Sequence, residues 1–400
     1  MLRSNLGVNS HPGDAVMDGM IDAPQMLMIG STGRDSGKTE LVCSLIDKFS
    51  AEHEVVAVKV TTVKDIDEKC TRSCADCAVC TDLSDNYLIT REIDEGRGKD
   101  TERMVAAGAS RVFWLRVLRD HLREGTEALL KGLGKDALVI CESNSVRSLV
   151  SPGAFLMCNR RGERSFKESA EAVRKQVDRL VTFTDGDAQS FDLNPDDVEI
   201  LPGGWALRAD AAAVILAGGM SRRMQVDKSM LPIAGRPMLE HIHGQLLPHF
   251  KQTLVSANDV DMYSFLGVRI VPDAVAGLGP LMGIASALQA SEHELNFVTA
   301  CDMPEVDVAL VRRMLREVEG FDGVVPIANG FIEPLCAVYR KSVISSFKDT
   351  LAQGQRKIRA ALDRCRINYI DITETEPLKN LNTREDYSGF IAELDDEPKD

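Results

Sequence analysis

Short apolar runs alternate with amphipathic stretches along most of this 400-residue chain. In its first half, apolar or alternating β-branched runs predict strands at 26–29, 54–60, 137–141 and 154–158. Apolar residues at helical spacing predict helices at 38–49, 101–107, 120–133 and 166–179. Strands that alternate with helices in this way predict a parallel sheet with right-handed crossovers.

The same alternation continues in the second half of the chain. Buried strands are predicted at 211–215, 254–256, 268–271 and 297–300, and amphipathic helices at 306–318 and 341–351. A further helix is predicted to begin at Pro237, because proline suits the first helical turn and apolar residues follow at helical spacing. We therefore predict an α/β fold made of two three-layer domains, which the resemblances described below identify as Rossmann-like.

Composition shifts divide the chain into five predicted segments, and 400 residues suffice for more than one hydrophobic core. The approach to the second domain is rich in Pro, Gly and Asp, which favours a linker there. The predicted segments are a disordered leader at 1–22, a first domain at 23–185, a linker at 186–209, a second domain at 210–390 and an acidic tail at 391–400.

The net charge of −14 argues against a broad nucleic-acid-binding surface, although a local cluster of basic residues is compatible with it. No apolar stretch approaches the roughly 20 residues that a membrane-spanning helix needs. Residues 1–21 also lack the continuous apolar core of a signal peptide. These features predict a soluble, cytoplasmic protein that binds neither nucleic acid nor membranes.

The stretch 216–228 carries the strongest chemical signal in the chain. It follows the predicted strand 211–215 and contains Gly218 and Gly219, with three cationic residues soon afterwards. Glycines allow the backbone to approach a ligand and expose its N–H groups, while cationic side chains offset phosphate charge. We predict that the loop binds the triphosphate group of a nucleotide. The alternative is a strand-to-helix turn with a solvated basic edge. The cations are Arg222, Arg223 and Lys228.

Two aspartates follow predicted strands of the second domain, and ligands of open α/β sheets bind beyond the carboxyl ends of the strands. Asp302 is the candidate Mg²⁺ ligand, because Mg²⁺ favours one or two protein carboxylates together with phosphate oxygens. Its alternative role is a helix N-cap near Pro304. Asp273 is a candidate second contact to nucleotide or metal, and its alternative role is a turn residue after Pro272.

The loop sequence LAGGMSRRMQVDK at 216–228 closely resembles the signature loop of molybdenum cofactor guanylyltransferases, which belong to a nucleotidyltransferase family with a Rossmann-like fold. Three later segments resemble further motifs of that family, namely the second glycine loop at 277–284, the metal-binding strand end at 297–304 and the Asn-x-Asn-Thr motif at 380–383. The resemblance covers about residues 211–390. Gln225 departs from it, since the family usually has Gly there, and this puts loop closure or turnover in doubt.

The resemblance implies an enzyme that uses GTP and Mg²⁺. In the implied reaction, the terminal phosphate of molybdopterin attacks the α-phosphorus of GTP, pyrophosphate leaves, and a guanine dinucleotide cofactor results. Lys228, with Arg222 or Arg223, is implied to stabilise the triphosphate and the leaving pyrophosphate, and backbone groups at 216–218 to contact the guanine edge. The implied nucleotide contacts are Leu216, Ala217, Gly218, Gly219, Lys228, Asn258, Asp273 and Asp302.

Three other functions stay open at the level of the sequence. A related enzyme class transfers CMP instead of GMP, and nucleotide-sugar pyrophosphorylases share the glycine–lysine loop. The third is a non-catalytic carrier of cofactor and nucleotide, which Gln225 alone favours. Molybdoenzyme apoproteins and cofactor insertion proteins are further candidate partners.

A second candidate phosphate site lies at 30–39, between a predicted strand and a predicted helix, and it ends in Gly-Lys-Thr as a phosphate-binding loop does. In such a loop the backbone N–H groups cradle phosphates, the lysine reaches them and the threonine holds Mg²⁺. Thr32 stands where the strict pattern has Gly, and an ordinary turn is the alternative. The candidate residues are Gly33, Gly37, Lys38 and Thr39.

The first domain resembles the molybdopterin-guanine dinucleotide biosynthesis adaptor family, MobB, over about residues 24–160. Besides the phosphate-binding loop, the similar parts are an Asp-Thr-x-Arg segment within 98–103 and an Ala-Gly-Ala segment within 106–109. The resemblance implies a GTP-binding adaptor fused to a guanylyltransferase. Glu142 ends a predicted strand and is a candidate second acidic group of this site, with helix capping or surface exposure as alternatives.

Four of the ten cysteines are packed into eleven residues with the spacing C-x3-C-x2-C-x2-C. Dense thiolates favour a soft or borderline metal, so an Fe–S cluster, a Zn²⁺ ion and no metal all stay open. The other six are scattered among apolar neighbours and are predicted to be small packing residues in a reducing compartment. The clustered residues are Cys70, Cys74, Cys77 and Cys80.

Overall fold

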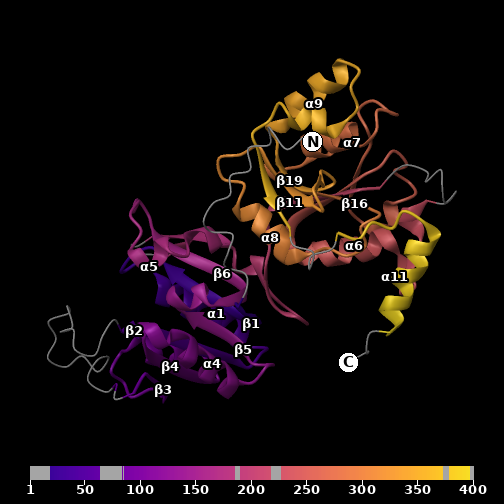
Figure 1. The fold of residues 1–400 in the computed structure, drawn as a ribbon. Helices are drawn as coiled ribbons and strands as arrows, with labels where there is room; N and C mark the ends of the chain where they lie inside the picture. The colour runs from indigo at the N-terminus through magenta and orange to yellow at the C-terminus, as the bar shows by residue number, and fades with distance from the viewer. Residues whose placement is uncertain are drawn as a thin grey trace. The chain divides into compact units, whose positions relative to one another are not determined.

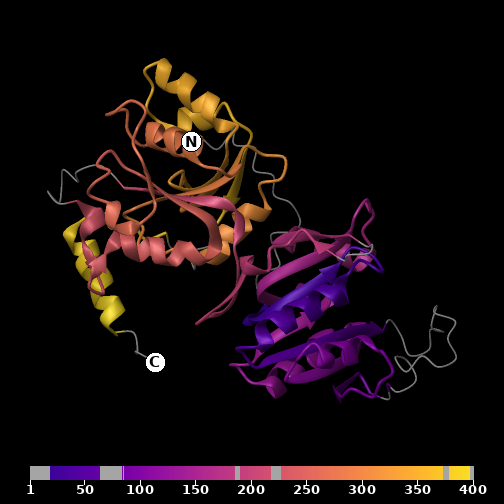
Figure 2. The same ribbon diagram turned by 180° about the vertical axis from the view of Figure 1, so that it is seen from behind.

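The computed structural model describes residues 19–63, 83, 85–184, 190–217, 227–372 and 378–396. The chain divides into two compact units, Met1–Leu207 and Arg208–Asp400 (Figures 1 and 2). Each unit has a mixed α/β fold built on one large sheet, as the sequence predicts. In the described part of the chain, no helix is both long enough and apolar enough to span a lipid bilayer.

The first unit is built on an eight-stranded sheet. In spatial order its strands are β3 (Tyr87–Glu92), β4 (Arg111–Leu118), β2 (Val55–Val63), β5 (Leu138–Glu142), β1 (Ile21–Ser31), β6 (Val150–Arg160), β7 (Arg179–Thr184) and β8 (Ser190–Phe191). Neighbours from β4 to β7 are parallel, whereas the edge strands β3 and β8 are antiparallel to their neighbours. The predicted parallel sheet is therefore confirmed except at its two edges.

Three of the four helices predicted for this unit form close to their predicted bounds, as α1 (Lys38–Ser50), α3 (Asp100–Ala106) and α4 (Leu122–Leu133). The predicted helix 166–179 is wrong, because its residues form the short helix α5 (Glu168–Glu171), a 3₁₀ turn and the first residue of β7. The Asp178 carboxylate accepts a hydrogen bond of 2.8 Å from the Phe155 backbone N–H. This contact holds the chain alongside β6 and favours an extended strand over a longer helix.

Alternate residues of the central strands face two different layers of helices. Leu27 of β1 is buried in a core with residues of α1 and α3, while its neighbour Met28 is buried in a core with residues of α4. Successive side chains of a strand point to opposite faces of the sheet. The first unit therefore has three layers, with helices on both faces of the sheet.

The predicted linker 186–209 contributes to the core of the first unit where the structure describes it. β9 (Val198–Leu201) and β10 (Gly204–Leu207) form an antiparallel hairpin. Trp205 of this hairpin is only 3% exposed and packs edge-on against Phe49, with 4.9 Å between the ring centroids. Burial of the indole ring stabilises packing of the hairpin on the unit, although its Pro, Gly and Asp content favoured a linker.

The sheet of the second unit contains a parallel part and an antiparallel part. In spatial order its strands are β15 (Arg269–Val271), β14 (Phe250–Ser256), β11 (Ala209–Leu216), β16 (Leu295–Ala300), β19 (Cys336–Arg340), β17 (Gly323–Ala328) and β18 (Phe331–Ile332), and β20 (Ile367–Asp371) also pairs with β17. The four strands that the sequence predicted, β15, β14, β11 and β16, are parallel to one another. β19 runs antiparallel to β16, and none of the strands from β17 onwards was predicted.

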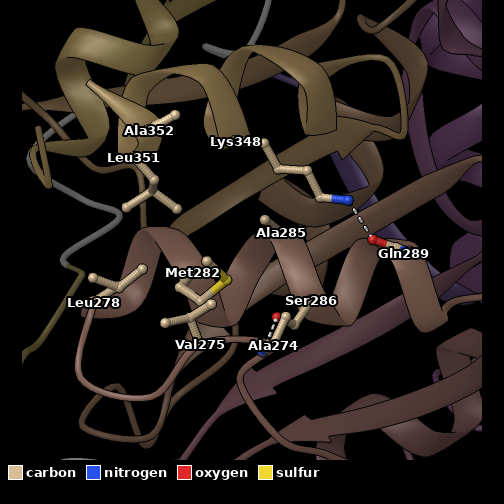
Figure 3. Close-up of a pocket in the computed structure, with 10 residues that line it drawn as sticks. All are labelled: Ala274, Val275, Leu278, Met282, Ala285, Ser286, Gln289, Lys348, Leu351 and Ala352. Carbon is tan, nitrogen blue, oxygen red and sulfur yellow. Dashed lines mark hydrogen bonds between the residues drawn. The ribbon is translucent and has the colours of Figure 1, made fainter. Parts of the chain in front are cut away.

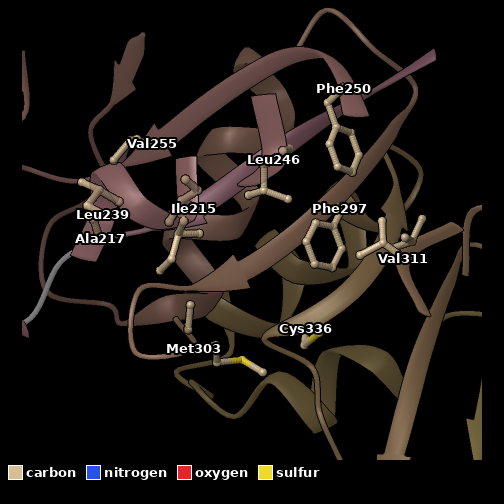
Figure 4. Packing of buried hydrophobic residues seen from close by; sticks show 14 of the residues in the cluster. Ile215, Ala217, Leu239, Leu246, Phe250, Val255, Phe297, Met303, Val311 and Cys336 are labelled. Carbon is tan, nitrogen blue, oxygen red and sulfur yellow. The ribbon is translucent and has the colours of Figure 1, made fainter. Parts of the chain in front are cut away.

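Two hydrophobic cores lie on the two faces of this sheet. The covering helices are α6 (Met238–Leu246) and α8 (Val308–Arg316) on one face and α7 (Pro280–Ala290) and α9 (Val343–Ala352) on the other. Figure 4 shows the first core, where the rings of Phe250 and Phe297 stack with 5.9 Å between centroids. Ala217 and Met303, which follow β11 and β16, are buried in the same core and so fix the ends of these strands.

The predicted acidic tail 391–400 is wrong in its first part. α11 (Arg384–Asp396) continues through the start of this segment, and residues 397–400 lie outside the described part of the chain. Phe390 is 3% exposed in the core of the second unit, and Ile391 packs against that core. Burial of these apolar side chains keeps the described start of this segment helical and packed on the unit.

Candidate functional site

The carboxyl ends of the parallel strands in the second unit meet at one edge of the sheet. Leu216, the last residue of β11, is in register with Ser256 of β14 and with Ala300 of β16. Asn258 and Asp302 each follow their strand by two residues and therefore lie beyond the same edge. The topology brings these predicted site residues together, in the place where open α/β sheets bind ligands.

Lys228, Asp302 and Asn382 form one hydrogen-bonded group. Lys228 Nζ lies 3.2 Å from Asp302 Oδ2 and 3.2 Å from Asn382 Oδ1. The side chains of Lys228 and Asp302 are 14% and 26% exposed, so their charges are screened less than those of a surface pair. The Leu381 backbone N–H donates to the Asp302 carbonyl oxygen at 2.8 Å, which fixes the segment that carries Asn382. Residues from three distant sequence motifs therefore meet at the ammonium group of Lys228.

The alternative role of Asp302 as a helix cap is excluded by the geometry of α8. The N-cap of this helix is Asp307, whose carboxylate accepts a hydrogen bond of 2.9 Å from the Leu310 backbone N–H. The Asp302 carboxylate instead faces Lys228. In this position the Asp302 carboxylate can bind a metal ion or another charged ligand, and it does not cap the helix.

Asn258 and Asp273 form a second polar group at the same edge. Asn258 Nδ2 donates to Asp273 Oδ2 at 3.1 Å, and the Asp273 backbone N–H donates to Asn258 Oδ1 at 2.9 Å. Gly283 in the first turn of α7 lies beside them, because a Cβ atom there would fall 2.8 Å from Ser256 Oγ and 3.4 Å from Asp273 Oδ1. The missing side chain lets the helix approach both the strand end and Asp273.

Two backbone groups at the end of β11 are already engaged in hydrogen bonds to neighbouring segments. The Ala217 N–H donates to the Ser256 carbonyl oxygen at 2.9 Å, and the Leu216 carbonyl oxygen accepts from the Cys301 N–H at 3.1 Å. An N–H group has one hydrogen to donate. The Ala217 N–H is therefore engaged in the sheet, and the implied contact of backbone groups at 216–218 with the guanine edge stays a prediction.

Tyr263 belongs to the site and was missed by the sequence analysis. Its side chain is 1% exposed, and its hydroxyl group donates to Asp227 Oδ2 at 2.8 Å. Asp227 immediately precedes Lys228 in the chain. Tyr263 comes from an irregular segment after β14, so neither a motif nor an apolar period pointed to it.

In the first unit, the predicted phosphate-binding loop joins β1 to α1. Gly37 precedes the helix with φ of 75°, and a Cβ atom there would fall 2.3 Å from Phe183 Cγ, so only glycine fits. Lys38 Nζ lies 3.1 Å from Glu142 Oε1, and Thr39 Oγ1 donates to Glu142 Oε2 at 3.0 Å. Glu142 is 2% exposed, so its carboxylate is held between these two groups and not at the surface. A Cβ at Gly33 would meet no atom within 4 Å, so close packing does not explain that glycine.

Two further lysines near this loop were missed by the sequence analysis. Lys59 of β2 pairs with Asp100 and lies 3.5 Å from Glu142 Oε1. Lys167 Nζ donates to Ser31 Oγ at 3.0 Å, and its backbone N–H donates to the Thr32 carbonyl oxygen at 2.8 Å. Partial burial, and then the nearby charge of Lys38, lowers the pKa of Lys167 to about 8. Tertiary structure alone brings these lysines to the loop.

Comparison with known proteins places the second unit in a family. The profile described as the MobA-like NTP transferase domain matches residues 213–366. A probable molybdenum cofactor guanylyltransferase from Pelotomaculum thermopropionicum is 35% identical over 171 residues, which are 43% of this chain and 83% of that protein. A molybdenum cofactor guanylyltransferase from Shewanella halifaxensis is 36% identical over 157 residues, which are 38% of this chain and 78% of that protein. The chain belongs to the MobA-like nucleotidyltransferase family.

A solved member, molybdopterin-guanine dinucleotide biosynthesis protein A from Archaeoglobus fulgidus, aligns over 46% of this chain and 98% of its own, with 25% identity and a TM-score of 0.42. The family match lies wholly within the second unit. The MobA-like unit is the nucleotidyltransferase part of the chain, and the groups around Lys228 and Asp273 are its candidate active site.

The donor set of the MobA-like site fits Mg²⁺ only when a substrate supplies further ligands. Within the described ranges, no group of three or more His, Cys, Asp or Glu side chains is placed to hold a metal ion. Asp302 offers one carboxylate, and Asn382 offers an amide oxygen to the same ammonium group. Mg²⁺ in nucleotide enzymes takes one or two carboxylates and completes its shell with phosphate oxygens and water. These residues match that requirement.

Several predicted residues lie outside the part of the chain that the structure describes. They are Gly218, Gly219, Arg222, Arg223 and Gln225 of the loop, and Cys70, Cys74, Cys77 and Cys80 of the cysteine cluster. Their roles stay predictions. Of the other six cysteines, Cys141, Cys158 and Cys336 are buried as predicted, whereas Cys43, Cys301 and Cys365 are partly exposed.

A cavity of about 350 Å³ lies between α7, α9 and the segment that follows Asp273 (Figure 3). Most of its lining is apolar, as with Val275, Met282 and Leu351. It is bordered by a hydrogen bond of 3.0 Å from the Ala274 N–H to Ser286 Oγ. Leu278 and Met282 of the predicted second glycine loop line it, but none of the individually predicted site residues that the structure describes does, so we place the candidate site at the strand ends and not in this cavity.

Proposed function

We propose that the MobA-like unit transfers GMP from GTP to the terminal phosphate of molybdenum-molybdopterin. An oxygen of that phosphate forms a bond to the α-phosphorus of GTP, the bond between the α-phosphorus and its leaving oxygen breaks, and pyrophosphate departs. The observation that carries the proposal is the group of Lys228, Asp302 and Asn382 at the carboxyl edge of the sheet. The names of the relatives, which are molybdenum cofactor guanylyltransferases, support the choice of substrates.

Charge neutralisation is the main task of these residues, because phosphoryl transfer needs positioning and electrostatic stabilisation more than a covalent nucleophile. Lys228 places a positive charge where the triphosphate and the departing pyrophosphate accumulate negative charge. Asp302 would hold a Mg²⁺ ion, which neutralises phosphate charge when bound. Lys228 then exchanges its contact with Asp302 for contacts with phosphate oxygens. Arg222 and Arg223 are proposed to assist it.

Asn258 and Asp273 are proposed to hold the nucleoside part of GTP. Their mutual hydrogen bonds fix both side chains, and Gly283 lets α7 pack close beside the carboxylate. A carboxylate can accept hydrogen bonds from adjacent donors, and guanine presents two on its N1–N2 edge where cytosine presents an acceptor and a donor. This difference favours GTP over CTP.

The test is pyrophosphate release by the full chain with Mg²⁺, with molybdopterin or its molybdenum form as acceptor, and with GTP or CTP in parallel. The proposal expects turnover with GTP and none with CTP. Turnover with CTP alone would assign the cytidylyl reaction, and turnover with a sugar phosphate but not with molybdopterin would assign a sugar nucleotide. An Asp302→Ala variant that binds GTP without turnover, beside an active parent, excludes the carrier function.

We also propose that the first unit binds GTP at the loop between β1 and α1, as an adaptor for the same pathway. Support comes from Lys38 and Thr39, which contact the buried Glu142, and from the left-handed Gly37 before the helix. Thr39 and Glu142 are the oxygen donors that suit Mg²⁺ there. The test is the stoichiometry of GTP binding to the full chain. Two sites are expected in the parent and one in a Lys38→Ala variant.

A further inference from the structure

Tyr263 connects the two polar groups of the MobA-like site. It lies in the segment after β14 that also contains Asn258, and Asn258 is hydrogen-bonded to Asp273. Its hydroxyl group reaches Asp227, 36 residues earlier in the chain, at a distance of 2.8 Å. At 1% exposure, the ring is enclosed by the protein and cannot serve as a ligand-facing surface.

Asp227 links Tyr263 to Lys228, because its carboxylate also caps the turn in which Lys228 lies. Its Oδ1 accepts hydrogen bonds from the Ser229 N–H at 3.0 Å and from Ser229 Oγ at 2.6 Å. These bonds cap the 3₁₀ turn Lys228–Met230. Ser229 is fully buried, and its Oγ also lies 3.1 Å from the Tyr263 hydroxyl oxygen. The Asp227 carboxylate is thus held by three donors from two segments.

The turn fixes the backbone from which the Lys228 side chain extends to Asp302 and Asn382. A lysine side chain is long and flexible, so the place of its ammonium group depends on how well its backbone is held. A side chain that ties this backbone to the segment of Asn258 also sets the distance between the proposed nucleoside and phosphate groups.

We propose that Tyr263 is a positioning residue for nucleotidyl transfer, which acts through Asp227 to hold Lys228 at Asp302. The inference rests on the proposed GMP transfer, because it assigns Lys228 to the phosphates. Tyr263 makes no contact with substrate. It acts as a fixed donor, since the Asp227 carboxylate only accepts hydrogen bonds.

Burial raises the pKa of Tyr263 well above its ordinary value, and the bond to the Asp227 carboxylate acts in the same direction. The hydroxyl group therefore keeps its proton in any pH range where the enzyme would be assayed. A change at this residue is expected to act by lost geometry and not by altered titration.

The test is a Tyr263→Phe variant, which keeps the ring and removes only the hydroxyl group. The matched control is Tyr339→Phe. Tyr339 is also fully buried in this unit, and its hydroxyl group donates to the Pro334 carbonyl oxygen at 2.8 Å in the other core. We expect kcat for pyrophosphate release to fall about tenfold in Tyr263→Phe, with KM for GTP changed less than about twofold. In Tyr339→Phe we expect kcat to stay within about twofold of the parent.

Equal kcat values in the two variants would overturn the proposal. A second criterion uses the double variant with Asp227→Asn, because residues that act through one contact give losses that do not add. We expect the double variant to retain about the kcat of Asp227→Asn alone, and fully additive losses would count against the proposal.

If Tyr263→Phe fails to fold, Ser229→Ala removes another donor to Asp227 and is judged by the same kcat and KM comparison. An inactive parent would refute the GMP transfer itself, whereas an active parent with an unaffected Tyr263→Phe would refute only the role of Tyr263.

Discussion

Lys228 Nζ lies 3.2 Å from Asp302 Oδ2, although 74 residues separate the two in the chain. The contact joins the loop after β11 to the end of β16, two strands that are parallel neighbours in the sheet. In this ion pair the lysine and the carboxylate offset each other's charge. We infer that nucleotide and Mg²⁺ replace this mutual contact, so that each charge is ready for its ligand without a large movement of the backbone.

Removal of the Lys228 charge tests this relationship. We expect Lys228→Met to lower kcat by about 10²- to 10³-fold, since a positioned donor to developing phosphate charge is lost. The control is Lys251→Met in the same unit, because Lys251 lies 3.5 Å from the exposed Asp210 in a surface pair. Steady-state pyrophosphate release measures both, and an unchanged kcat in Lys228→Met would contradict the assignment.

Gly283 tests the proposed place of the nucleoside. We expect Gly283→Ala to raise KM for GTP several-fold, because its Cβ atom would fall 2.8 Å from Ser256 Oγ and 3.4 Å from Asp273 Oδ1. Gly244→Ala is the matched control, since Gly244 lies in α6 and a Cβ there would meet no atom within 4 Å. Alanine in that helix is expected to add up to about 1 kcal/mol of stability without a change in KM. Equal KM values in the two variants would argue against a nucleoside at Asp273.

The pH dependence of GTP binding to the first unit tests the role of Lys167. Its pKa is lowered to about 8 by partial burial and the charge of Lys38, and Arg34 adds to this effect while Glu142 opposes it. Because the folded pKa lies below the ordinary value, the free protein loses this proton as the pH rises through about 8. A bound phosphate would favour the charged form, so we expect affinity to fall above that pH and proton uptake to accompany binding.

Calorimetry in two buffers of different ionisation enthalpy measures this uptake. Lys167→Met is expected to bind GTP more weakly at neutral pH and to lose the pH dependence. Lys131→Met, at an exposed position of α4, is expected to behave like the parent. The same sign rule gives a stability effect in the absence of nucleotide, since the parent becomes more stable as the pH rises above about 8 and Lys167→Met does not.

Trp205 tests the inclusion of the predicted linker in the first unit. We expect Trp205→Ala to lower the free energy of unfolding of this unit by about 3–5 kcal/mol, as for other buried aromatic side chains. Ile93→Ala is the control in the same unit, because Ile93 is 64% exposed. Denaturant unfolding measures both, and a loss below about 1 kcal/mol in Trp205→Ala would show that the hairpin does not belong to the core.

The strands and helices that the sequence predicted correctly are those whose signals are local. α1 has a regular apolar face, and β11 contains the continuous apolar run 211–216, which ends just before the glycines of the loop. The prediction of a helix at 166–179 was wrong because the contact of Asp178 with Phe155 spans 23 residues, and a local pattern does not reveal such a contact. The hairpin at Trp205 was missed for a related reason, since Pro, Gly and Asp also favour the tight turns of hairpins.

The same division applies to the candidate site. The chemical groups can be identified from the sequence, because Lys228, Asp273, Asp302 and Lys38 stand in motifs or at the ends of apolar runs. Which of these groups lie close together depends on the folded arrangement of the strands. The register of β11 with β14 and β16 sets the pairing of Lys228 with Asp302, and the irregular segment after β14 brings Tyr263 to Asp227. Motifs and apolar periods extend over a few residues, whereas these contacts depend on sheet order and side-chain burial across the whole unit.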